Sequence, residues 1–145
     1  MEEREDTLSL LRECNSWIQM WVSAIEDVID KIESPKLKEE LESSMKEHER
    51  LGNETHDLLN ELGEKVEETH PIAKEMSKMK TSVKMALDEN DKTAAGLISD
   101  GCHMGIKSLS KYLNMYEKAG EKSKDIARKL ISMEDSLDKK MRCYL

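Results

Sequence analysis

Apolar residues recur along this chain at alternating spacings of three and four positions, and this repeat constrains the fold more than any other feature. Near the N-terminus the repeat comprises Leu11, Cys14, Ile18, Trp21, Ile25, Val28 and Ile32. Such spacing places apolar side chains on one stripe of an α-helix, whereas a strand would alternate every second residue. The pattern therefore predicts a helix over 6–33 that packs along one seam.

Proline and glycine divide the chain into further helices. Pro35 suits the first position of a second helix, Ser34 can cap it, and Gly63 supplies the left-handed residue that commonly closes a helix. A loop over 64–70 and a restart at Pro71 predict a third helix. The second helix has a partly polar seam, comprising Leu41, Ser44, His48, Leu51, Thr55, Leu58 and Leu62.

Two more helices are predicted towards the C-terminus. Turn-forming residues over 88–91 precede a fourth helix that Gly120 ends, and a fifth helix runs from about Lys122 to the end. Charged residues make up 37% of the chain and aromatic residues 3%, which suits helices with solvated faces and thin aliphatic seams. These features predict an all-α protein whose single domain, 1–145, is an antiparallel bundle of four to five helices.

Charge, cysteine content and the lack of long apolar stretches argue against several classes of partner and several cellular locations. The net charge of -8 opposes binding to phosphate backbones, so no nucleic-acid partner is expected. The start 1–6 lacks a secretory signal, and no stretch reaches the roughly 18 apolar residues of a membrane helix. The three cysteines are widely spaced, which favours reduced thiols. We therefore expect a cytoplasmic protein without a membrane partner.

A metal site is the first chemical hypothesis, because di-iron bundles place Glu and Glu-x-x-His side chains inside four helices. The literal match at 67–70 precedes Pro71, where helical stacking is lost, and we interpret it as accidental. A better-placed set comprises His48, Asp100, His103, Glu26 and Glu134. If these residues converge, they could bind iron, zinc or manganese.

The alternative to the metal hypothesis is a structural role for the same residues. His48 would then be a hydrogen-bonded seam histidine beside Ser44 and Thr55, while Asp100 and His103 are solvated and Glu26 and Glu134 lie on exposed flanks. On this interpretation no cofactor is expected. Inward-pointing His48 and His103 side chains would favour the metal, because buried ionisable groups must be paired or ligated.

The fourth helix carries the spacing Gly101-x-x-x-Gly105, which lets another helix approach closely. A tight internal crossing is the first interpretation, and a dimer contact or ligand slot is the alternative. Trp17 is, with these glycines, a candidate interaction surface, since it shares a helix face with Trp21 and borders the seam. Cys102 and His103 point about 100° apart, which opposes a thiol enzyme.

The chain also resembles a family. The stretch 94–106, the preceding 78–81, Glu134 and the closing 144–145 resemble small uncharacterised ferritin-like bundles of Gram-positive anaerobes. The resemblance implies a ferritin-like fold. Where such relatives tend to have a Glu, this chain has Gly96, so the resemblance does not imply an intact metal site.

These observations favour a protein without catalysis. Phosphate loops, nucleophile elbows and HExxH helices are missing from the sequence. We expect the chain to act by binding a protein partner or by self-association, with Trp17, Gly101 and Gly105 at the interacting surface. The alternative is a ferritin-like protein that binds iron, zinc or manganese through a degenerate carboxylate and histidine site.

Overall fold

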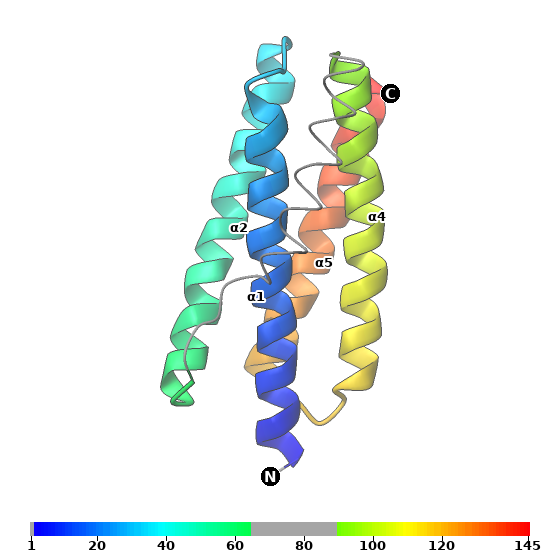
Figure 1. The fold of residues 1–145 in the computed structure, drawn as a ribbon. Coiled ribbons are helices and arrows are strands. Elements are labelled where there is room, and N and C mark those ends of the chain that lie inside the picture. Colours follow the sequence, from blue (N-terminus) through cyan, green and yellow to red (C-terminus); the bar gives the residue numbers. More distant parts are fainter. Residues whose placement is uncertain (1, 65–89) are drawn as a thin grey trace.

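The computed structural model describes residues 2–64 and 90–145. These ranges contain four α-helices, α1 (Glu2–Ile29), α2 (Pro35–Glu61), α4 (Asp91–Met115) and α5 (Glu121–Met141), and a short 3-10 helix, η1 (Arg142–Tyr144) (Figure 1). No strand occurs in them, so the prediction of an all-helical chain is confirmed. The predicted third helix, starting near residue 71, lies outside the described residues.

Contacts at the two ends of the bundle establish how the helices run. The Asp91 carboxylate accepts hydrogen bonds from the backbone N–H groups of Glu33 and Ser34, at 2.9 and 2.8 Å, so α4 starts beside the turn between α1 and α2. At the other end the backbone N–H of Gly120 donates to Thr7 Oγ1, at 2.7 Å. Figure 1 shows the result, in which α1 and α5 run one way while α2 and α4 run the other.

Local chemistry explains most of the helix ends. The Ser34 side chain accepts a hydrogen bond from the backbone of Leu37, at 3.2 Å, and the Asn90 side chain accepts one from the backbone of Thr93, at 2.7 Å. Gly63 has a φ of 77°, the left-handed conformation that favours glycine after a helix. The predicted cap of α2 at Ser34 is therefore confirmed, and the cap of α4, Asn90, lies within the stretch 88–91 that was predicted to precede this helix.

The ends of α1 and α4 differ from the prediction. The first helix begins at Glu2 rather than near residue 6, because acidic residues in its first turn stabilise a helix N-terminus. It ends at Ile29, four residues before the predicted 33. The fourth helix ends at Met115, and Gly120 is the N-cap residue of α5 instead of the end of α4.

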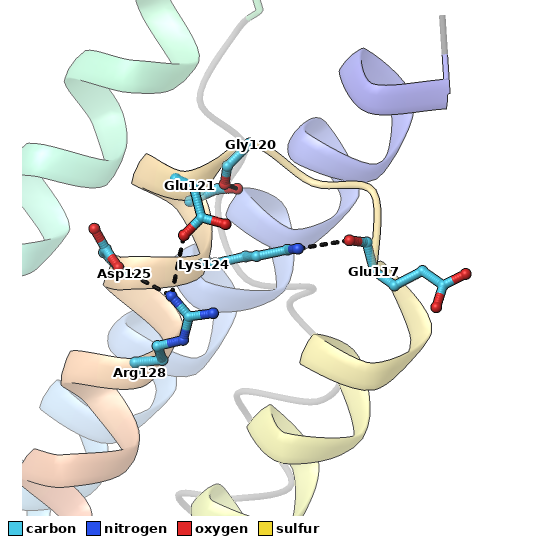
Figure 2. A network of polar contacts seen from close by, with 7 residues as sticks. Glu117, Gly120, Glu121, Lys124, Asp125 and Arg128 are labelled. Carbon is cyan, nitrogen blue, oxygen red and sulfur yellow. Dashed lines mark hydrogen bonds and ion pairs between the residues drawn. The ribbon is translucent and has the colours of Figure 1, made fainter.

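Side chains close the turn between α4 and α5 (Figure 2). Lys124 Nζ donates to the backbone carbonyl of Glu117, at 2.6 Å, which joins the first turn of α5 to the residues after α4. Arg128 pairs with the carboxylates of Glu121 and Asp125, at 3.3 and 3.1 Å. These exposed ion pairs each add little stability, but they lie where α5 has to start.

The core lies along the predicted seams. All seven apolar seam positions of the first helix are buried, namely Leu11, Cys14, Ile18, Trp21, Ile25, Val28 and Ile32. They pack against buried side chains of α2, α4 and α5. None of the described helices is long and apolar enough to span a membrane.

Candidate functional site

The polar seam of α2 meets a buried carboxylate of α5. His48 and Glu134 are both 0% exposed, and His48 Nε2 lies 2.5 Å from Glu134 Oε1. Two of the predicted metal ligands are therefore in direct contact. The expectation that Glu134 lies on an exposed flank is wrong, because the α5 stripe that carries it faces the centre of the bundle.

The hydrogen bonds of His48 define where a proton must be. Nδ1 lies 2.7 Å from the Ser44 backbone carbonyl, which can only accept, so Nδ1 carries a hydrogen. A second proton must lie between Nε2 and Glu134, since two lone pairs would repel at this distance. The pair therefore consists of an imidazolium and a carboxylate or of their neutral forms. As predicted, Ser44 lies beside His48, whereas Thr55 donates to the carbonyl of Leu51.

Trp17 completes this buried arrangement. Its indole Nε1 donates to Glu134 Oε2, at 3.3 Å, so both side-chain oxygens of Glu134 have hydrogen-bond partners. The rings of Trp17 and Trp21 stack with centroids 5.6 Å apart, and the Trp21 ring lies 6.1 Å from that of His48. We call Trp17, Ser44, His48 and Glu134 the core polar cluster.

The two glycines of α4 receive the two tryptophan rings. A Cβ added at Gly101 would lie 2.4 Å from Trp21 Cζ3, and one added at Gly105 would lie 2.3 Å from Trp17 Cζ2. Both distances are too short for carbon atoms in contact. Trp17 and Gly105, which were expected to belong to an interaction surface, instead pack against each other inside the bundle, where Trp17 is only 7% exposed. Gly101 packs against Trp21, so the two glycines form the tight internal crossing that was the first interpretation of their spacing.

The remaining predicted metal ligands lie elsewhere. Glu26 and Asp100 are exposed, and the His103 side chain is 64% exposed. The five predicted ligands therefore do not converge, and no group of three or more metal-binding side chains occurs within residues 2–64 and 90–145. The physical reason is helical geometry. His103 follows the buried Cys102, so its side chain points about 100° away from that of Cys102 and lies mostly in solvent.

A second polar cluster lies one helical turn along α5. The Asp138 carboxylate is nearly buried and accepts a hydrogen bond from Ser99 Oγ, at 2.5 Å, while His103 Nε2 lies 3.0 Å from it and Arg142 3.4 Å. Burial alone raises the pKa of Asp138, but the hydrogen bonds from Ser99 and His103 outweigh it and hold the pKa below its ordinary value. Sequence reasoning missed Asp138, although its spacing of four residues from Glu134 was a usable signal.

Two of the thiols are buried and have little reactivity, and one of them, Cys102, lies near the carboxylates of both clusters. Burial, and then the Glu13 carboxylate, raises the pKa of Cys14 to about 12. Burial, followed by the Glu134 carboxylate, also raises the pKa of Cys102. A buried thiol of raised pKa forms little thiolate and is a poor nucleophile. Cys143 is the exposed thiol of the three.

The core polar cluster has the properties of a structural element. Its titratable groups are buried, they bind one another, and its indole and imidazole are packed against neighbouring rings. Comparison with models of protein families, with curated proteins and with solved structures found no match. Function must therefore be inferred from the geometry of this chain alone.

Proposed function

We propose that this chain is a non-catalytic helical-bundle protein that acts by self-association through the outward face of α4. The core polar cluster supports the first part of this proposal. His48 and Glu134 are 0% exposed and bind each other, so a substrate would have to displace core side chains to reach them. Such a pair specifies how helices fit together rather than performing chemistry at a surface.

The observation that carries the second part is a pair of exposed methionines. Met104 is 59% exposed and Met115 is 52% exposed, and both belong to α4. They are separated by eleven positions, close to three helical turns, so they lie on one stripe about 16 Å apart. Flexible methionine side chains are common at surfaces that adapt to a protein partner.

Charge indicates what this stripe would meet. Lys107 and Lys111 are exposed between the two methionines, in a chain whose net charge is -8. The outward face of α2 presents more acidic than basic residues, with Glu39, Glu42, Glu47 and Glu54 exposed beside Lys46 and Arg50. A second copy could therefore place its α2 face on α4, with opposite charges around the methionines.

Sedimentation velocity over a range of concentrations tests self-association. We expect the wild type to form dimers or larger species at low salt, and the Met104→Glu, Met115→Glu variant to remain monomeric because it places negative charge against the acidic α2 face. Ser132→Glu, Ser136→Glu is the matched control, since both serines are exposed on α5 and this variant also gains two negative charges. A wild type that is monomeric up to about 1 mM would refute the proposal.

We also propose a ferritin-like fold for the bundle and a cytoplasmic location without nucleic-acid or membrane partners. The directions of the helices support the fold. The pairs α1 with α2 and α4 with α5 each run in opposite directions, while α2 and α4 run in the same direction. Ferritin-like bundles have this order, with two hairpins joined by one long crossover connection.

The alternative, binding of iron, zinc or manganese, retains only His48 and Glu134 of its predicted ligands in contact. Two buried ligands without a third in the described residues do not fit a transition-metal site. Mass spectrometry of metals in untagged protein, purified without chelator, tests this directly. Stoichiometric metal that disappears in a His48→Ala, His103→Ala variant would establish the alternative and overturn a purely structural role for the cluster.

A further inference from the structure

The two methionines on the outward face of α4 differ from the other described methionines in accessibility. Within residues 2–64 and 90–145, the exposed large apolar side chains are Met104, Met115 and Leu145. The remaining methionines of these ranges are buried or partly buried, namely Met20, Met45, Met133 and Met141. A small reagent in solvent therefore reaches Met104 and Met115 more readily than the other four.

Oxidation by a hydroperoxide is the reaction that an exposed thioether undergoes and an exposed aliphatic side chain does not. The lone pair of the sulfur attacks one peroxide oxygen, so an S–O bond forms while the O–O bond breaks. The sulfur is oxidised by two electrons, and the peroxide is reduced and leaves, after proton transfer, as water or an alcohol. The product, methionine sulfoxide, is polar, and methionine sulfoxide reductases return it to methionine.

The lysines of α4 are placed to bind the new oxygen. Lys107 follows Met104 by three residues, and Lys111 precedes Met115 by four, so each lysine shares a helix face with one methionine. Both lysines are exposed. A sulfoxide oxygen accepts hydrogen bonds, and an ammonium group has three to donate. Oxidation would therefore engage the lysines that are proposed to meet the carboxylates of a second copy.

The α2 face of a second copy offers a sulfoxide few donors. Four exposed glutamates there outnumber Lys46 and Arg50, and an ionised carboxylate can only accept hydrogen bonds. Burying an acceptor without a donor costs about 1–3 kcal/mol, which corresponds to about tenfold in a dissociation constant. A thioether buried at the same place has no such requirement, because it packs as an apolar group.

We propose that Met104 and Met115 are a reversible oxidation site for hydroperoxides, at which sulfoxide formation separates self-associated copies of this chain. The inference rests on the proposed self-association through α4. By linkage, a second copy that covers the two thioethers protects them from the peroxide. Oxidation therefore acts on free chains and keeps them apart.

Hydrogen peroxide treatment followed by sedimentation velocity tests this site. A thiol reductant added after the peroxide returns disulfides and sulfenic acids to thiols but leaves sulfoxides in place. We expect peptide mass spectrometry to find sulfoxide at Met104 and Met115 before Met141, and more slowly as protein concentration rises. The dissociation constant should rise about tenfold or more, and methionine sulfoxide reductases should restore it.

Two leucine variants separate these methionines from other oxidisable groups. Peroxide should leave the dissociation constant of Met104→Leu, Met115→Leu unchanged, because this variant keeps apolar side chains and all three cysteines but lacks the two sulfur atoms. Met20→Leu, Met141→Leu is the matched control, since it removes two sulfur atoms from α1 and α5 and should keep the response to peroxide.

The outcomes distinguish this inference from the proposed function. A wild type that is monomeric before oxidation would refute self-association and the inference with it. A wild type that associates equally well with sulfoxide at both positions would overturn the inference alone. An equal response to peroxide in the Met104→Leu, Met115→Leu variant would also overturn it.

Discussion

The packing of tryptophan rings on glycine in α4 makes a sharp prediction, because one helix holds both the test position and its control. Gly105 lies under the Trp17 ring, and an added Cβ would be 2.3 Å from Trp17 Cζ2. Gly96 lies in the same helix, and a Cβ added there meets no atom within 4 Å. The same change from glycine to alanine should therefore have opposite effects at the two positions.

Magnitudes follow from the surroundings of each glycine. At Gly96 the change to alanine should stabilise the protein by about 1 kcal/mol, the usual difference in helix propensity. At Gly105 that gain is opposed by overpacking, which costs about 1–3 kcal/mol. Trp17 cannot withdraw freely, since its indole donates to the buried Glu134, and losing that bond costs about 1–3 kcal/mol more. We expect Gly105→Ala to destabilise the protein by about 2 kcal/mol.

Urea unfolding followed by circular dichroism at 222 nm measures both variants on one scale. The free energies of unfolding of Gly96→Ala and Gly105→Ala should differ by about 3 kcal/mol, the sum of a gain of about 1 and a loss of about 2. Tryptophan fluorescence should change in Gly105→Ala alone, because only that variant disturbs the stacked rings. If Gly105→Ala is as stable as the wild type, the ring does not lie on this glycine and the reasoning is refuted.

Three further predictions concern buried ionisable groups. Glu134→Leu should lower the free energy of unfolding by about 3 kcal/mol because it leaves His48 unpaired, and adding His48→Leu should restore part of the loss. A double-mutant cycle with no coupling energy would contradict an interaction between His48 and Glu134. Since the pKa of Asp138 is lowered in the fold, its contribution to stability is complete above the ordinary pKa and is lost as pH falls through the lowered one. Unfolding experiments between about pH 5 and about pH 2 should therefore show a steeper loss for the wild type than for Asp138→Asn, and equal slopes would contradict this. Finally, a thiol reagent should label Cys143 rapidly and the other two cysteines only after unfolding, as counted by mass spectrometry, and rapid labelling of all three would contradict their burial.

Much of the secondary structure could be predicted, because its causes are local. The alternation of three and four positions along the first helix follows from helical periodicity, and every predicted seam residue there is buried. The caps at Ser34 and Asn90 depend on side chains that reach only three residues along the chain. Helix ends without such a capping side chain are predicted less accurately, as at Ile29, where the first helix ends four residues before the predicted position.

The pairing of His48 with Glu134 could not be predicted, although both residues were singled out. The two are separated by 86 positions, and their contact depends on how far α2 and α5 slide along each other. Helical spacing determines which face a residue occupies but not its height relative to another helix. For the same reason His103 was grouped with the wrong residues, since its partner Asp138 depends on the register of α4 with α5.

The register itself is explained by two matching spacings. Trp17 and Trp21 are four residues apart on α1, Gly101 and Gly105 are four apart on α4, and the two helices run in opposite directions, so each ring finds one glycine. Sliding α4 by one turn either way would leave one ring on a glycine and put the other against Leu97 or Leu109, where a side chain fills the space. The Trp17 indole that packs on Gly105 also donates a hydrogen bond to Glu134. It therefore connects α1 to the buried pair formed by His48 of α2 and Glu134 of α5. The glycines are therefore needed for the core polar cluster to form, although neither of them touches its charged atoms.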